Sequence, residues 1–222
     1  MKISIAMTTY NSSMFINKQL NSLLNQSLPF DELVIVDDCS KDNTLDILKK
    51  FCDDNYNRNI KIFRNAINSG YVKSFEKAIY ECTGDIIFLC DHDDIWNLKK
   101  IEEVYKVFAK YKNVKCVGTS FNKIDEKGDY ILEKERINVS NHGYIKRKIK
   151  KKISPMKLSE IIYCNFTPGC CLAISNEIIY GLRGKFNIAP HDYLISVYAA
   201  LKNELYFLDE RLVDYRIHKD NT

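Results

Sequence analysis

The sequence predicts an α/β protein with a mostly parallel central sheet flanked by helices. Three observations support this fold class. Short apolar runs alternate with amphipathic segments through the first 118 residues, which is typical of buried parallel strands joined by helices. The chain has 222 residues, 45% of them hydrophobic, and can bury a substantial core. Beyond about residue 120 the alternation becomes irregular, so we expect a smaller mixed part there.

The expected strands of the first half are the apolar runs at 3–7, 33–36, 60–63, 85–90 and 114–118. Helices are expected between them, because apolar residues recur there at helical spacing. Ser40 or Asp42 would cap the helix after the second strand. The segments 71–81 and 97–111 are the later helices of this half.

The second half is expected to open with a hairpin at 121–132 and to continue into a polar, aperiodic stretch at 133–155. We then expect a short helix near 157–163, a strand near 170–174, a helix near 190–202, and strands near 205–208 and 212–216. The two halves, 1–118 and 119–222, are expected to form one domain.

Charge and cysteine content exclude several classes of protein. The difference between 33 Lys+Arg and 29 Asp+Glu is only +4, and without a recognition motif this argues against nucleic-acid binding. The eight cysteines include no Cys-x-x-Cys pair, which argues against structural zinc and is typical of reduced thiols in a cytoplasmic protein. No apolar run reaches the ~20 residues of a membrane-spanning helix, and the run at 3–7 is too short for a signal peptide.

Polar residues follow each strand of the first half, at the edge where an open parallel sheet binds its ligands. In strand order they are Thr8, Thr9, Tyr10 and Asn11; Asp37 and Asp38; Arg64, Asn65 and Asn68; and Asp91, His92, Asp93 and Asp94. The chain has neither a G-x-G-x-x-G turn nor a P-loop, which argues against dinucleotide-binding proteins and simple NTPases.

The acidic cluster of Asp91, Asp93 and Asp94 directly follows a strongly apolar strand. Carboxylates this close repel one another unless a cation is present. Mg²⁺ or Mn²⁺ together with a substrate diphosphate would supply that charge, because these hard ions take oxygen ligands. The alternative is an acidic cap for the next helix, with Asp94 at its start.

Seven short motifs, in this order and spacing, resemble those of the inverting family 2 glycosyltransferases of GT-A fold. They are residues 5–11 (IAMTTYN), 34–40 (VIVDDCS), 68–70 (NSG), 91–96 (DHDDIW), 167–171 (TPGCC), 191–193 (HDY) and 215–221 (YRIHKDN). The fourth is similar to the rhamnosyltransferase-like branch, which usually has Gln where this chain has His92. The resemblance implies a Rossmann-like sheet, a donor-binding half over 1–118, and an acceptor and catalytic-base half over 119–222.

The resemblance also implies residue roles. Thr8, Thr9, Tyr10 and Asn11 would contact the nucleotide of a UDP- or dTDP-sugar. Asp38 would bind the pyrimidine, with Asp37 as the less favoured substitute, and Asn68 and Lys73 are weaker donor-site candidates. Asp91 would lie near the ribose and the metal, and Asp93 and His218 would be metal ligands. Gly169, Cys170 and His191 would lie on the acceptor side, and Asp192 would be the general base.

Three of these roles have a plainer alternative. Asp192 is also placed to cap the helix that follows it. His218 is otherwise an ordinary surface histidine near the end of the chain, and Tyr10 a core aromatic at a strand end. The basic run at 146–152 is best interpreted as a solvated loop, and contact with anionic lipid at the inner membrane face is its alternative.

The expected reaction is a metal-dependent, inverting transfer of a sugar to a hydroxyl of a saccharide or lipid-linked acceptor, as in surface polysaccharide biosynthesis. Two other functions remain open at this stage. A sugar-phosphate nucleotidyltransferase has a related sheet, but normally shows a Gly-rich loop where Thr8, Thr9 and Tyr10 stand here. A nucleotide-sugar-binding module without catalysis would keep the donor site alone.

Overall fold

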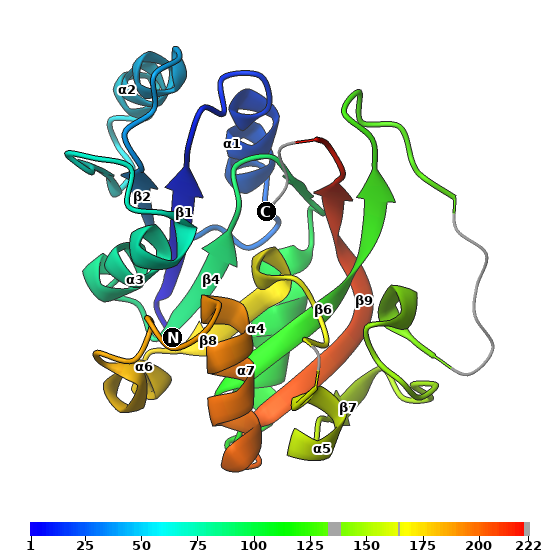
Figure 1. Cartoon of the computed structure of the whole chain (residues 1–222). Helices are drawn as coiled ribbons and strands as arrows, with labels where there is room; N and C mark the ends of the chain where they lie inside the picture. The colour runs from blue at the N-terminus through cyan, green and yellow to red at the C-terminus, as the bar shows by residue number, and fades with distance from the viewer. Residues whose placement is uncertain (133–138, 164, 220–222) are drawn as a thin grey trace.

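The computed structural model describes residues 1–132, 139–163 and 165–219, shown in Figure 1. Within these residues nine strands form one sheet in the order β3-β2-β1-β4-β8-β6-β9-β5, with β7 paired to β9. Both halves of the chain contribute strands to this sheet. The predicted α/β fold class, with a parallel part and a mixed part, is confirmed.

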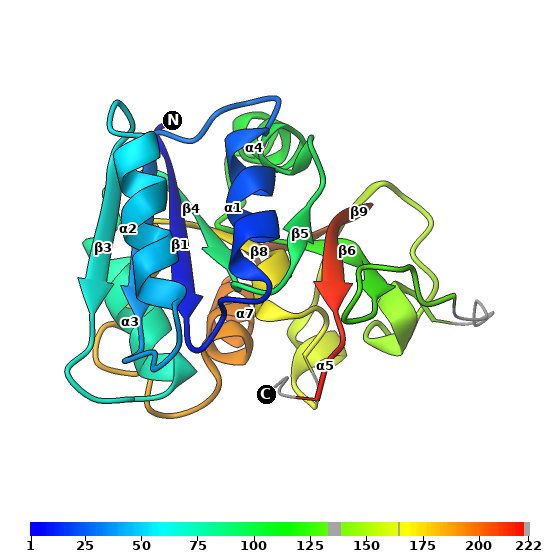
Figure 2. The same cartoon turned by 90° about the horizontal axis from the view of Figure 1, so that it is seen from above.

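Four strands of the first half run parallel, namely β1 (Ile3–Thr9), β2 (Glu32–Asp37), β3 (Ile60–Arg64) and β4 (Ile86–Cys90). Every residue of β1, β2 and β4 is buried, because helices cover both faces of the sheet (Figure 2). The hydrophobic core on one face of the sheet includes side chains of α1 (Ile16–Leu24), α2 (Thr44–Asp54) and α4 (Lys100–Lys110). The core on the other face includes side chains of α3 (Tyr71–Glu81), α6 (Glu177–Leu182) and α7 (His191–Leu201).

The mixed part begins with β8 (Leu172–Ser175), which runs antiparallel between β4 and β6 (Cys116–Ile124). Beyond β6 lies β9 (Leu205–Arg216), parallel to it, and β9 also pairs with β5 (Ile95–Trp96) and β7 (Ile153–Pro155). The start of β8 therefore lies beside the end of β4.

The structure corrects two boundaries of the second half. The two strands expected at 205–208 and 212–216 are one continuous strand, β9, because register shifts in its pairing with β6 carry it through the polar residues between them. The strand expected near 170–174 begins later, at Leu172, and the 3₁₀ turn η2 (Gly169–Cys171) precedes it.

The expected hairpin is present, because Ile124 and Tyr130 form an antiparallel bridge. The Asp125 carboxylate closes its turn by accepting hydrogen bonds from the backbone N–H groups of Lys127, Gly128 and Asp129. Part of the stretch expected to be irregular is ordered, since it holds the 3₁₀ turn η1 (Asn141–Gly143) and β7.

The remaining short elements differ from expectation in extent rather than in kind. The short helix expected near 157–163 is α5 (Leu158–Ile161), and the helix expected near 190–202 is α7. β5 and α6 were not expected, because each is too short to show a periodic pattern. None of the helices in the described ranges is long and apolar enough to cross a membrane.

Candidate active site

A cleft of about 1060 Å³ lies at the carboxyl ends of β1, β2 and β4, where η2 and the start of α7 face them. The predicted site residues that line it come from both halves of the chain: Thr8, Thr9, Tyr10, Asn11, Asp38, Asn68, Asp91, Asp93, Gly169, His191, Asp192 and His218. Three other predicted residues, Asp37, Lys73 and Cys170, do not line it. Tyr10 is 39% exposed, so it is not the core aromatic of the alternative interpretation.

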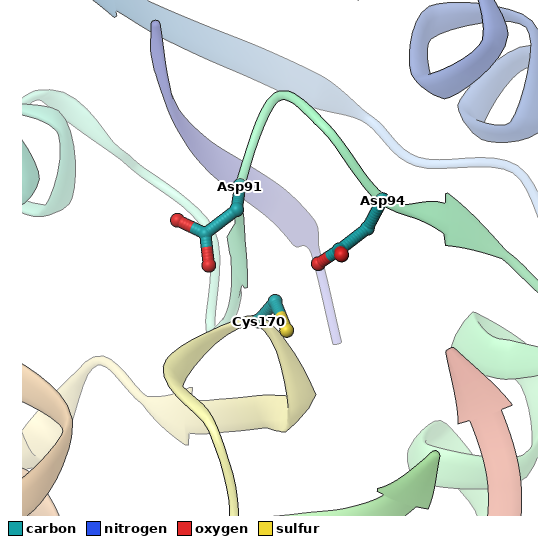
Figure 3. Close-up of side chains that lie close together, drawn as sticks. All are labelled: Asp91, Asp94 and Cys170. Atoms are coloured by element: carbon teal, nitrogen blue, oxygen red, sulfur yellow. The ribbon is translucent and has the colours of Figure 1, made fainter. Parts of the chain in front are cut away.

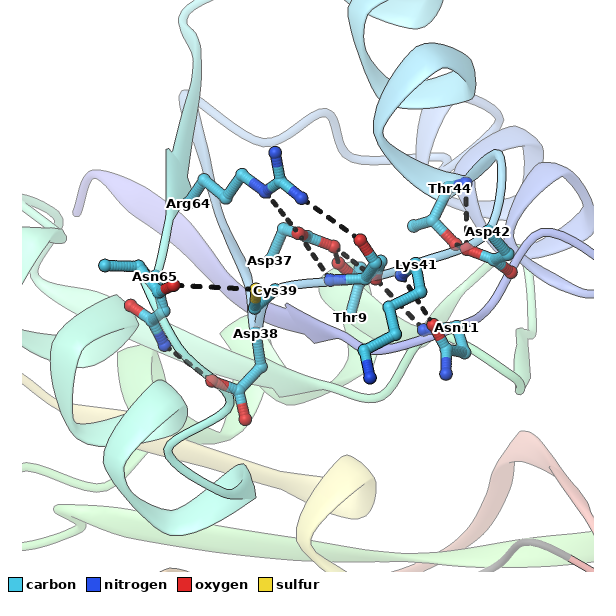
Figure 4. A network of polar contacts seen from close by, with 12 residues as sticks. Thr9, Asn11, Asp37, Asp38, Cys39, Lys41, Asp42, Thr44, Arg64 and Asn65 are labelled. Carbon is cyan, nitrogen blue, oxygen red and sulfur yellow. Dashed lines mark hydrogen bonds and ion pairs between the residues drawn. The ribbon is translucent and has the colours of Figure 1, made fainter.

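Asp37 is fully buried at the end of β2, where its carboxylate holds the following turn together (Figure 4). It accepts hydrogen bonds from the Thr9 hydroxyl at 3.1 Å and from the Ser40 backbone N–H at 3.0 Å, and pairs with Arg64 at 3.6 Å. The turn needs this support, because Cys39 has a φ of 64°, in the left-handed region. Asp37 therefore shapes the site from behind the cleft.

Asp38 faces the cleft and anchors the 68–70 turn. Its Oδ1 accepts hydrogen bonds from Asn65 at 2.8 Å, seen in Figure 4, and from the Ser69 backbone N–H at 2.9 Å; its Oδ2 accepts from the Gly70 N–H at 2.8 Å. Burial raises the pKa of Asp38, but these hydrogen bonds outweigh it and hold the pKa below its ordinary value. Gly70 supplies a φ of 85° at the turn into α3.

The loop after β4 carries three carboxylates with different partners. Asp93 Oδ2 lies 2.7 Å from His218 Nε2, so these two predicted metal ligands are brought together. Oxygen atoms of Asp91 and Asp94 and the Cys170 sulfur lie within 4.8 Å of one another, as Figure 3 shows. His218 is therefore not an ordinary surface histidine, since its side chain is only 7% exposed and paired with Asp93.

Asp94 is fully buried and does not cap the next helix, which begins only at Lys100. Its Oδ1 accepts a hydrogen bond from the Arg216 backbone N–H at 2.9 Å, whereas its Oδ2 has no hydrogen-bond partner among the described residues. Burial, and then the charge of Asp93, raise the pKa of Asp94 well above its ordinary value. Burial raises the pKa of Asp91 in the same way, followed by the charges of Asp93, Asp94 and Asp192.

The carboxylates of Asp91, Asp93 and Asp94, together with His218, fit a hard divalent cation, because such ions prefer oxygen ligands. Asp94 Oδ2 also has no hydrogen-bond partner among the described residues. Burial first, and then mutual repulsion, raise the pKa values of Asp91 and Asp94, and a bound cation would oppose both effects by stabilising the ionised carboxylates. Cys170 is a poor ligand by comparison, because burial holds the pKa of its thiol well above the ordinary value.

Arg216 fastens this loop to the second half of the chain and was missed as a separate site residue, although it stands in the last motif. Its side chain is fully buried. Nε donates to the Asp93 carbonyl at 2.7 Å, and Nη1 donates to the carbonyls of Asp125 at 2.8 Å and Glu126 at 3.0 Å. Its guanidinium also lies over the Phe15 ring, 4.8 Å from the centroid. The last two residues of that motif, Asp220 and Asn221, lie outside the described residues.

Asp192 is the second residue of α7, after Pro190 at the N-cap position, so it is not the cap. Its Oδ2 accepts a hydrogen bond from Asn165 Nδ2 at 2.6 Å, and its Oδ1 accepts from the Tyr193 backbone N–H at 2.8 Å. Burial raises the pKa of Asp192 and these hydrogen bonds oppose the shift, with a net rise. Asn165 also lines the cleft; no spacing or composition signal in the sequence marks it.

His191 packs beside Asp192 as a neutral, buried ring. It stacks on Phe75 with centroids 4.1 Å apart, and burial lowers its pKa to about 3. A Cβ at position 169 would lie 2.9 Å from His191 Nε2, so only glycine fits at this position of η2. Gly169 and His191, both predicted on the acceptor side, are therefore in contact.

The basic run at 146–152 lies outside the cleft and is partly neutralised. Arg147 pairs with Glu160, and Lys152 pairs with Glu103 at 3.0 Å and also with Glu210. The side chains of Lys146, Lys150 and Lys151 are exposed.

This fold is one that glycosyltransferases adopt. The model of the family "Glycosyl transferase family 2" matches residues 4–177, and the chain belongs to this family. The putative glycosyltransferase EpsE of Bacillus subtilis is 32% identical over 127 residues, which are 57% of this chain and 45% of EpsE.

Solved structures agree on the fold. Staphylococcus aureus TarS, residues 1–349 with UDP-GlcNAc, superposes with a TM-score of 0.75 at 22% identity over 100% of this chain and 60% of that chain. The mannosyltransferase PcManGT of Pyrobaculum calidifontis, with GDP-Man and Mn²⁺, gives a TM-score of 0.65 at 14% identity over 93% of this chain and 56% of that one. The rhamnosyltransferase-like branch stays a prediction.

Proposed function

We propose that this protein is a metal-dependent, inverting glycosyltransferase that moves a sugar from a nucleoside diphosphate sugar to a hydroxyl of a saccharide or lipid-linked acceptor. The observation that carries the proposal is one cleft that is lined both by the acidic loop after β4, with Asp91 and Asp93, and by Asp192. An inverting transfer needs those two groups on opposite sides of the reacting carbon.

The donor would lie along the ends of β1, β2 and β4. Thr8, Thr9, Tyr10 and Asn11 would contact the nucleotide, and Asp38 would accept a pyrimidine N–H. Asp38 Oδ2 has room for that bond, because within the described part of the chain it accepts one hydrogen bond, from the Gly70 N–H. A uridine or thymidine base offers this N–H, so both UDP- and dTDP-sugars fit, and the TarS complex with UDP-GlcNAc supports a nucleotide sugar as the donor.

Asp91, Asp93 and His218 would hold Mg²⁺ or Mn²⁺, which neutralises a diphosphate leaving group when bound. The Mn²⁺ of the PcManGT complex supports this assignment. We assign Asp37 to the turn behind the site and keep Asn68 at the donor. Lys73, exposed on α3, stays a prediction.

Asp192 would act as the general base. As the acceptor hydroxyl attacks the anomeric carbon, its proton passes to the Asp192 carboxylate and the nucleoside diphosphate departs on the opposite face. General base catalysis of this kind contributes ~10²–10⁴-fold. The start of α7 favours the ionised carboxylate, and Gly169 and His191 would shape the acceptor side beside it.

The acceptor and its setting are proposed with the same site. EpsE is described only as a putative glycosyltransferase, while TarS is a poly(ribitol-phosphate) β-N-acetylglucosaminyltransferase; the latter supports a surface polysaccharide as acceptor. A cytoplasmic enzyme working on a lipid-linked acceptor would approach the inner membrane face. Lys146, Lys150 and Lys151 are among the exposed residues of the basic run and would make that contact.

The test is release of nucleoside diphosphate from a panel of UDP- and dTDP-sugars with Mn²⁺, comparing wild type with Asp192→Asn and Asp93→Ala. We expect turnover with one donor, a loss of at least ~10²-fold in Asp192→Asn with donor binding retained, and weaker Mn²⁺-dependent donor binding in Asp93→Ala. Turnover that survives both changes, or is undetectable with every donor, contradicts the mechanism. Pyrophosphate release from a nucleoside triphosphate and a sugar phosphate would instead identify a nucleotidyltransferase, and selective donor binding without turnover a binding module.

A further inference from the structure

Asn165 is the side chain from outside α7 that donates a hydrogen bond to the Asp192 carboxylate among the described residues. We propose that Asn165 is a positioning residue, which fixes the rotation of the Asp192 carboxylate so that one lone pair of each oxygen stays available to the acceptor hydroxyl. This inference rests on the proposed role of Asp192 as the general base.

The orientation of the Asn165 amide is set at both ends. Its Oδ1 accepts the Phe166 backbone N–H at 3.0 Å, so the opposite end, Nδ2, is the one that reaches Asp192 Oδ2 at 2.6 Å. A reversed amide would place two oxygens against each other and would lose both hydrogen bonds. The donor toward Asp192 is therefore specified by the backbone.

The support behind Asn165 is rigid. Phe166 is fully buried, and its carbonyl accepts a hydrogen bond from the buried Asn141 side chain at 2.8 Å. The Phe166 ring occupies the space where a Cβ at position 118 would lie, 2.4 Å from two ring atoms. The residue that follows Asn165 is thus held by β6 and η1.

The Asp192 carboxylate is consequently held on two sides, by Asn165 at Oδ2 and by the Tyr193 N–H at Oδ1. Each oxygen keeps accepting capacity for a substrate hydroxyl. The titratable residues that line the same cleft include Asp91 after β4, Tyr71 at the start of α3, and His191 and Tyr193 on α7, and the charge of Asp192 is felt at Asp91. Asn165, by contrast, does not titrate and donates its hydrogen bond to Asp192 at any pH.

The sharpest test is Asn165→Asp, because this change keeps the size of the side chain and an oxygen for the Phe166 N–H, and replaces only the donor that faces Asp192. We expect kcat to fall about 10–100-fold with the donor dissociation constant within about twofold of wild type. The acid limb of the kcat–pH profile should move up by about one to two pH units, because the ionised base loses a hydrogen bond and gains a neighbouring carboxylate. Asn165→Ala should move the limb in the same direction and serves if Asn165→Asp does not fold.

Asn122→Asp is the matched control. Asn122 Nδ2 donates to Asp214 Oδ1 at 2.8 Å between β6 and β9, away from the cleft. The same exchange there should lower stability to a similar degree and leave the pH profile where it is in wild type. A structural role for Asn165 would make the two variants behave alike.

Two results separate the inference from the proposed function. If Asp192→Asn is inactive while Asn165→Asp keeps the wild-type kcat and acid limb, or changes only the donor KM, the positioning role is wrong and the base assignment survives. If Asp192→Asn keeps its turnover, the base assignment itself fails, whatever Asn165 does.

Discussion

Arg216→Lys tests how far the position of the acidic loop after β4 (residues 91–94) depends on one buried side chain of β9. The guanidinium donates three hydrogen bonds to carbonyls, at 2.7 Å to Asp93, 2.8 Å to Asp125 and 3.0 Å to Glu126. Lysine keeps the charge but presents a compact ammonium, which cannot reach carbonyls spread over two loops. The backbone hydrogen bond from residue 216 to Asp94 survives, so the change isolates the side chain.

The expected loss follows from the carbonyls left without a donor. If lysine satisfies one of the three, two carbonyls lose their donor. The hydrogen bond to Asp93 is buried and those to Asp125 and Glu126 are partly buried, so each loss costs about 1–2 kcal/mol. We therefore expect the free energy of unfolding to fall by about 2–4 kcal/mol in urea titrations followed by circular dichroism. Asp93 should also lose its fixed position, so Mn²⁺ should protect the variant less against urea than it protects wild type.

Arg211→Lys is the control, because Arg211 lies on the same strand with an exposed side chain; its stability should change by less than about 0.5 kcal/mol. An Arg216→Lys variant that unfolds within about 0.5 kcal/mol of wild type, with the same gain from Mn²⁺, would refute the reasoning. The three carbonyl contacts would then carry no net stability.

Three further predictions concern other contacts. Glu32 is fully buried; burial raises its pKa, but hydrogen bonds from Lys61, Ser4 and Thr83 outweigh this and lower the pKa from 4.5 to about 2. Because the pKa of Glu32 is depressed in the folded state, Glu32→Gln should lower the free energy of unfolding by about 2–3 kcal/mol at pH 7, a figure reduced for the partly exposed Lys61. In thermal melts, the difference in stability from wild type should disappear as the pH falls from 4.5 to 2. Gly118→Ala should lower the free energy of unfolding by about 1–3 kcal/mol, because the new methyl group meets the Phe166 ring at 2.4 Å. Gly184→Ala would also lower stability, but for a different reason, namely backbone strain at its φ of 74°, and away from the cleft. His218→Asn should weaken Mn²⁺-dependent donor binding measured by calorimetry while leaving donor binding without metal unchanged, and equal losses in both titrations would contradict a role at the metal.

The first half of the fold could be predicted because its signals are local. Strands buried on both faces appear as unbroken apolar runs, and the polar residues that follow them mark the edge where the cleft forms. Asp37 shows the limit of this reasoning. It stands next to Asp38 in the sequence, yet only Asp38 reaches the cleft, because the direction of each side chain depends on where β2 ends and how the next turn bends.

The second half was harder to predict because long-range pairing determines its elements. β9 continues through the polar residues 209–211 only because β6 shifts register beside it, and β5 and β7 are strands only through their pairing with β9. Asn165 is a similar case. Its importance comes from the proximity of Asp192, twenty-seven positions away, which no local pattern records.

The direction of β8 determines how this family member can vary. Had β8 run parallel to β4, the chain before it would have entered at the far edge of the sheet, and a long excursion would have been needed to bring it to Asp91. Because β8 runs the other way, the chain that follows β6 returns to η2 at the rim of the cleft without passing through the donor half. Tyr144, Tyr163, Asn165 and Pro168 of this stretch line the cleft. We therefore expect segments exchanged between Ile124 and Gly169 to alter acceptor choice while the nucleotide site stays intact, so that this stretch is the natural place to graft a new specificity.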